Sequence, residues 1–138
     1  MSYEHWDDAL PVQASGIGPN TFVYEELAVF APDGPEKWDV LEKQLARLDY
    51  LILSSNRGYG AIMSVPHRYP RMAAWYADLF AGKASFVKVA EFTSYPRLCL
   101  PEIVVGRNGN CLEFPDQWME EAFTVYDHPV VMIYKRMP

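Results

Sequence analysis

The sequence predicts a single α/β domain over residues 1–138, built as a Rossmann-like β-α-β-α-β sheet with an added hairpin and an antiparallel C-terminal strand. Three observations support this fold class. Apolar residues recur at helical spacing after Pro35 and again after Pro70. Short apolar runs of strand length alternate with these two segments. Near the C-terminus, the Asn108-Gly109 pair between apolar runs is typical of a β-hairpin.

Composition limits the classes of protein to consider. The chain has 138 residues, of which 50% are hydrophobic, so it can bury the core of one domain. Its formal charge is −6 and it contains no basic tract, which argues against a nucleic-acid partner. The longest apolar runs are of strand length, whereas a membrane-spanning helix needs about 20 apolar residues. We therefore expect no membrane crossing, and any export signal would lie outside this acidic, aromatic N-terminus.

The first half of the chain predicts a strand followed by a helix. A strand is expected over residues 21–30, and the Pro-Asp-Gly-Pro cluster at 32–35 ends it. Within that cluster, Asp33 or Gly34 would be the N-cap of the helix that begins at Pro35. The apolar face of this helix, which should pack on a sheet, consists of Trp38, Leu41, Leu45 and Leu48.

The next segment predicts the centre of the sheet. The continuous apolar run 50–53 suits a central strand that is covered on both faces. It leads into a polar, glycine-containing loop at 54–60, and a second helix follows the proline-bounded segment 66–70. Gly82 is expected to end that helix in the left-handed conformation.

Three further strands complete the prediction. Residues 86–92 form a mostly buried strand, and 102–105 pairs with 111–114 in the hairpin. The last strand, 130–134, should lie antiparallel beside 86–92. The predicted core comprises Trp38, Leu41, Leu45, Leu51, Leu53, Leu79, Phe80, Val89 and Val131.

The two cysteines, Cys99 and Cys111, flank the predicted hairpin and could meet across it. Their spacing fits neither a zinc site nor a CxxC redox motif. A disulfide and two free thiols both remain open at this point.

Two segments are the principal candidates for a ligand site. The loop 54–60 follows the predicted central strand, where open α/β sheets usually bind ligands, and 66–71 begins the next helix. Arginines together with helix-terminal NH groups would hold a phosphate. The alternative is a loop whose side chains bond to neighbouring backbone. The candidate ligand-binding residues of the two segments are Asn56, Arg57, Tyr59, Arg68, Tyr69 and Arg71.

Each of the other polar clusters can be interpreted either as a functional site or as a structural feature. Residues 4–8 place a histidine between carboxylates, with Trp6 able to stack on a sugar ring, but contiguous residues of an extended segment cannot converge on one metal ion. Asp127 and His128 could form an acid-base pair or a turn before the last strand. The serines of the 54–60 loop lack a nucleophile elbow, which leaves a small hydrolase as the third hypothesis. We assign no catalytic residue, metal site or cofactor.

Five segments, taken in order, span nearly the whole chain and together resemble a known family. They are 4–11 (EHWDDALP), 49–57 (DYLILSSNR), 68–70 (RYP), 92–96 (FTSYP) and 121–129 (EAFTVYDHP). They resemble the soluble domain that follows the last membrane helix in bacterial and archaeal polytopic glycosyltransferases of the dolichyl-phosphate-mannose-protein mannosyltransferase type. The resemblance implies a location on the extracytoplasmic face of the cell membrane. It also implies sugar transfer from a polyprenyl-phosphate donor without a nucleotide cofactor.

The resemblance carries over no catalytic residue. In such enzymes the catalytic acid lies on a loop between early membrane helices, which this chain does not contain. We therefore expect a non-catalytic accessory domain whose partners are a membrane-embedded transferase part and a glycan or polyprenyl-phosphate ligand. The alternative is a self-standing interaction or structural module that has kept the fold. Aromatic residues suited to sugar stacking or to an oligomer interface are Trp6, Tyr59, Tyr69 and Trp118.

Overall fold

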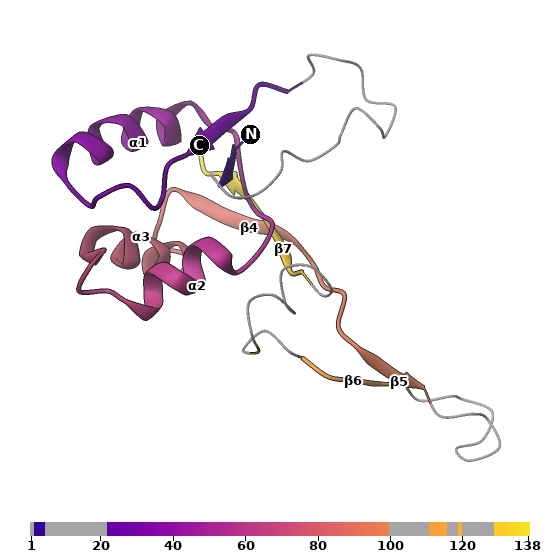
Figure 1. Cartoon of the computed structure of the whole chain (residues 1–138). Helices are drawn as coiled ribbons and strands as arrows, with labels where there is room; N and C mark the ends of the chain where they lie inside the picture. The colour runs from indigo at the N-terminus through magenta and orange to yellow at the C-terminus, as the bar shows by residue number, and fades with distance from the viewer. Residues whose placement is uncertain (1, 5–21, 100–110, 116–118, 120–128) are drawn as a thin grey trace.

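The computed structural model describes residues 2–4, 22–99, 111–115, 119 and 129–138 (Figure 1). Within these ranges the helices lie between residues 35 and 80, and strands precede, separate and follow them. The elements are β1 (Ser2–Glu4), β2 (Glu25–Leu27), α1 (Pro35–Arg47), β3 (Tyr50–Leu53), α2 (Arg57–Ser64), α3 (Pro70–Phe80), β4 (Phe86–Phe92), β5 (Arg97–Cys99), β6 (Cys111–Glu113) and β7 (Val131–Arg136). In the described part, no helix combines the length and apolar character that spanning a bilayer requires.

The main sheet is antiparallel and has the order β3-β7-β4. Tyr134 of β7 lies opposite Leu51 on one side and opposite Lys88 on the other. The prediction that the last strand runs antiparallel beside 86–92 is therefore confirmed. The prediction that 50–53 is the central strand is wrong for this three-stranded sheet, because β7 occupies the middle. A parallel pair, β1 with β2, lies next to it, with β1 in contact with β3.

The helices cover one face of the sheet. Leu51, Leu53 and Tyr134 point to this face, where they join buried side chains of all three helices in one core. Figure 1 shows α1, α2 and α3 gathered on one side of β4 and β7. The mixed α/β class is thus confirmed. The described elements do not show the parallel sheet with helices on both faces that a Rossmann-like fold requires.

Both predicted helices are present. The structure also has a third helix, α2, which begins inside the predicted 54–60 loop. Helix α1 has Gly34 as its N-cap and Pro35 in its first turn, as one of the two predicted alternatives had it. Helix α3 begins at Pro70, and Gly82 beyond its end has φ +69°. The loop predicted over 54–60 instead enters helix α2 at Arg57. Burial of Ile62, which is fully shielded from solvent, outweighs the low helix propensity of the glycines there.

The predicted core is right for most of its members. Trp38, Leu41, Leu51, Leu53 and Leu79 are buried, Leu45 packs against them, and Val131 is half-buried. Phe80 is 39% exposed and Val89 is 51% exposed, so these two predictions are wrong. Val89 lies at an irregularity in the β4–β7 register between Lys88 and Ala90, which removes it from the regular alternation of faces. The strand predicted over 21–30 is regular only at Glu25–Leu27.

The C-terminal hairpin has a different register from the predicted one. Strand β6, Cys111–Glu113, pairs with β5, Arg97–Cys99, whereas the predicted partner strand 102–105 lies outside the described residues. The hairpin extends away from the helices (Figure 1). Its position beyond the main core explains why its side chains are exposed.

Candidate ligand-binding surface

The three candidate arginines do not gather at one point. Arg57 begins α2, whereas Arg68 and Arg71 flank the start of α3. Helix α2 has 8 residues, which corresponds to roughly 12 Å of helix between its ends. The ring of Tyr59, near the start of α2, lies 5.1 Å from that of Phe80 at the end of α3, so the start of α3 lies beside the far end of α2.

Arg71 and Arg68 contact the domain itself. One guanidinium nitrogen of Arg71 lies 2.8 Å from Glu42, and its Cζ stands 4.4 Å from the centre of the Trp38 ring. Arg71 thereby connects α3 to α1. The Cζ of Arg68 lies 5.5 Å from the centre of the Tyr69 ring. The Arg71 contacts favour a structural role for that side chain, whereas the Arg68 contact is with its own neighbour in the chain.

The NH groups at the start of α3 already have a carboxylate acceptor. Asp33 Oδ2 accepts hydrogen bonds from the backbone NH of Arg71 at 2.6 Å and of Met72 at 3.0 Å. Its Oδ1 accepts one from Trp38 Nε1 at 2.6 Å. Burial by itself would raise the pKa of Asp33, but these hydrogen bonds and the charge of Lys37 together lower it. The proposed phosphate site at this helix terminus is therefore occupied by the chain's own side chain.

Lys37 and Tyr69 complete this buried cluster. Lys37 Nζ donates to the carbonyl oxygens of Val29 at 2.6 Å and Ala31 at 3.2 Å, and it lies 3.6 Å from Asp33 Oδ1. Burial lowers the pKa of Lys37, and the neighbouring Asp33 opposes that shift. Tyr69 is only 9% exposed and its hydroxyl donates to the Phe30 carbonyl at 3.4 Å. The candidate ligand residue Tyr69 is thus part of the core.

Two other candidates, Asn56 and Tyr59, line a pocket. It has a volume of about 630 Å³ and lies between α2, the end of α3, the end of β4 and the start of β7. The rings of Tyr59 and Phe80 meet edge to face in its wall. Its lining includes Asn56, Tyr59, Met63, Phe80, Glu91 and Met132. Of these, only Asn56 and Tyr59 were predicted from the sequence as site residues.

The charge beside the pocket is negative and locally compensated. Glu91 is an ionisable residue of the lining, and its carboxylate lies 2.6 Å from Lys88 Nζ. Burial first, and then the charge of Glu91, raises the pKa of the neighbouring Tyr134. Among the described residues that line the pocket there is no lysine or arginine.

The other clusters yield no assembled reactive group in the described part. Ser55 is 2% exposed and its Oγ accepts a hydrogen bond from the Arg57 backbone NH at 3.3 Å, so it stabilises the start of α2. His67 is exposed. The described residues hold no group of three or more His, Cys, Asp or Glu suited to a metal ion. Trp6, Trp118, Asp127 and His128 lie outside the described residues.

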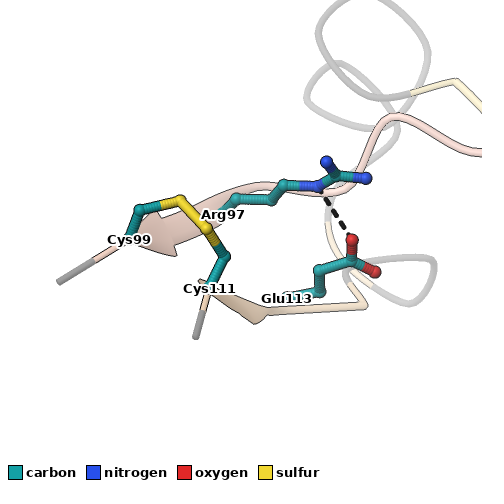
Figure 2. Close-up of a disulfide and its surroundings, with 4 residues drawn as sticks. All are labelled: Arg97, Cys99, Cys111 and Glu113. Carbon is teal, nitrogen blue, oxygen red and sulfur yellow. Dashed lines mark ion pairs between the residues drawn. A yellow bond between two sulfur atoms is a disulfide. The ribbon is translucent and has the colours of Figure 1, made fainter. Parts of the chain in front are cut away.

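The hairpin carries a disulfide on one face. Figure 2 shows Cys99 and Cys111 joined across the two strands, with their Cα atoms 4.1 Å apart. On the same face the ion pair Arg97–Glu113 has a nitrogen-oxygen distance of 2.8 Å. The intervening pair, Leu98 and Leu112, points to the other face and is 52% and 55% exposed. Of the two alternatives left open by the sequence, the structure contains the disulfide.

Apolar side chains are also exposed along the strands that lead to the hairpin. We call the six large ones the exposed apolar band: Val87, Val89, Phe92, Leu98, Leu112 and Phe114. They belong to β4, to the hairpin strands and to the residue that follows β6.

Comparison of the chain with protein-family models, curated proteins and solved structures gives no match.

Proposed function

We propose that the chain is a non-catalytic accessory domain of a polyprenyl-phosphate-sugar-dependent membrane glycosyltransferase. It lies on the extracytoplasmic face, packs against the membrane-embedded transferase part, and contacts the acceptor or the lipid-linked donor. The observation that carries this proposal is the exposed apolar band, because surfaces of this kind mark interaction sites. The family resemblance described above supplies the identity of the partner.

The exposure of the band is high for side chains of this type. Phe92 is 61% exposed and Phe114 is 50% exposed. Single exposed apolar residues are ordinary on protein surfaces, but six of them follow β4 and the hairpin strands, and covering them with a partner would gain free energy. A packing role for this surface follows.

The buried polar groups Asp33 and Lys37 serve the fold of the domain. Asp33 and Lys37 are bonded to backbone groups of the domain and to each other. Their hydrogen bonds join the segment that follows β2 to α1 and α3. A catalytic acid or base needs to reach its substrate, and the contacts of these two groups point inward instead.

Site-specific photo-crosslinking in cells that contain the membrane-embedded transferase tests this function. A photoreactive residue at Phe92 should give an adduct with a polytopic membrane protein. The matched control is the exposed Asp39 on the outer side of α1, which should give none. Adducts only between copies of this chain would reject the accessory role and favour the self-standing module.

A further inference from the structure

The pocket beside α2 has the dimensions of a small-molecule site. Its volume of about 630 Å³ lies within the range of roughly 300–1,000 Å³ that is common for ligand pockets. Residues of α2, α3, β4 and β7 contribute to it, together with Met119 from the segment between β6 and β7.

The walls of the pocket are suited to a hydrocarbon. Met63 and Phe80 are 38% and 39% exposed, which leaves apolar surface at the pocket accessible to a ligand. Methionine side chains are flexible and adapt to irregular apolar shapes. A hydrocarbon chain entering here would remove this surface, together with its own, from water.

The polar residues of the pocket already take part in interactions within the chain. Ser64 Oγ already donates to the Ala61 carbonyl at 2.7 Å, and both Asn56 and Tyr59 have partners of their own. Sugar hydroxyl groups that leave water need new hydrogen bonds, and their loss is costly when those bonds are not made. The pocket therefore favours apolar groups over a glycan.

The charge of the pocket disfavours an anion. Glu91 lines it, and none of the described lining residues is a lysine or arginine. A phosphate placed here would lie close to a carboxylate without a cation of its own, since Lys88 is already bonded to Glu91. This distinguishes the pocket from the arginine-based phosphate site expected from the sequence.

We propose that this pocket binds the hydrocarbon chain of a lipid, with any phosphate of that lipid held outside it. The natural ligand rests on the proposed function and would be the polyprenyl chain of the lipid-linked donor or acceptor. The selectivity for an uncharged hydrocarbon rests on the pocket alone.

Titration of the chain with three soluble probes tests the proposal. The probes are geraniol, geranyl phosphate and methyl α-mannoside. Binding of each is measured from chemical-shift changes at Tyr59, Met63 and Met132. Geraniol should bind, and geranyl phosphate, whose phosphate would stay outside the pocket, should bind no more tightly. Geranyl phosphate binding more tightly than geraniol, or methyl mannoside binding in place of geraniol, would overturn the proposal.

Three variants test whether geraniol binds in this pocket. Met63→Glu should weaken geraniol at least about tenfold, the factor expected when the burial of one apolar side chain is lost. Met63→Leu should retain binding, and Val40→Glu, on the exposed face of α1, should leave it unchanged. Equal affinity of Met63→Glu and the parent chain contradicts the proposal. If geraniol binds but the photoreactive residue at Phe92 gives no adduct with a membrane protein, the hydrocarbon pocket is supported and the proposed function is rejected.

Discussion

Asp33 shows how one side chain can hold two distant segments together. The sequence predicts it as one of two N-cap candidates for α1, but Gly34 takes that position. Asp33 instead caps α3, accepting from a backbone NH that is 38 residues away in the chain. A carboxylate at a helix N-terminus is stabilised by the unpaired NH groups and by the helix dipole. The local pattern indicated a cap correctly and could not indicate which helix was capped.

Neutralising Asp33 should destabilise the fold strongly. Asp33→Asn removes the counter-ion of Lys37, which is 9% exposed, and weakens the cap of α3. Removing one partner of a buried ion pair costs about 3–5 kcal/mol. Denaturant unfolding of the variant and the parent chain at neutral pH measures this loss.

The exposed pair Arg71–Glu42 provides the control. Its side chains are 54% and 61% exposed, so Glu42→Gln should cost less than about 1 kcal/mol. Equal losses for Asp33→Asn and Glu42→Gln would contradict the buried role of Asp33.

The pKa of Asp33 predicts an acid-dependent loss of stability. Its folded-state pKa lies below the ordinary value of 3.8, so the unfolded chain takes up a proton first as the pH falls. The stabilisation from Asp33 is complete well above pH 3.8 and is lost as the pH falls through the folded-state pKa. The difference in unfolding free energy between the parent and Asp33→Asn should therefore become smaller as the pH falls below 3.8. A constant difference down to acid unfolding would assign the effect to something other than ionisation.

At the scale of elements, the sequence predicts α1 and α3 because their signals are local. Each begins with a proline in its first turn and carries an apolar stripe that packs on the sheet. Helix α2 was missed because its two glycines and polar start are typical of a loop. Its stability comes from the complete burial of Ile62, which depends on residues elsewhere in the chain.

Strand β3 should be essential to the core even though it does not lie in the middle of the three-stranded sheet. Leu51 is fully buried there, so Leu51→Ala should cost about 2–5 kcal/mol through lost transfer energy and the cavity left behind. Val40→Ala, at a site that is 58% exposed, should change stability by no more than about 0.5 kcal/mol. An unchanged denaturant midpoint for Leu51→Ala would show that β3 is misplaced.

The hairpin should unfold separately from the core when its disulfide is reduced. Leu98 and Leu112 are both more than half exposed and do not belong to the core cluster. An isolated two-stranded hairpin is only marginally stable in water. Reduction, or Cys99→Ser with Cys111→Ser, should therefore accelerate amide exchange at Leu98 and Leu112 while leaving the unfolding midpoint of the core nearly unchanged. A midpoint that falls together with the loss of the hairpin would place it within the cooperative unit.

At the scale of the whole molecule, the candidate site was only partly predictable. Asn56 and Tyr59 lie next to a strand end, and this local position identified them. Phe80 and Glu91 join them from two other elements, and no spacing in the sequence links these residues. The arginine site was predicted from charge, from helix-terminal NH groups and from the expected sheet edge, but Glu42 and the Trp38 ring account for Arg71 once α1 and α3 are packed together.

The isolated chain is expected to show no sugar transfer from a polyprenyl-phosphate sugar. The resemblance places the catalytic acid of such enzymes in the membrane part, and Asp33, a carboxylate held inside the described fold, is fixed by Trp38 and the start of α3. A hydrocarbon pocket and an apolar band can position a lipid and a partner, and the carboxylate that lines the pocket, Glu91, is paired with Lys88. Transfer of radiolabelled sugar should equal that of a control without protein. Turnover above this control that is lost in Glu91→Gln, a conservative change beside the pocket, would show that the domain is itself an enzyme.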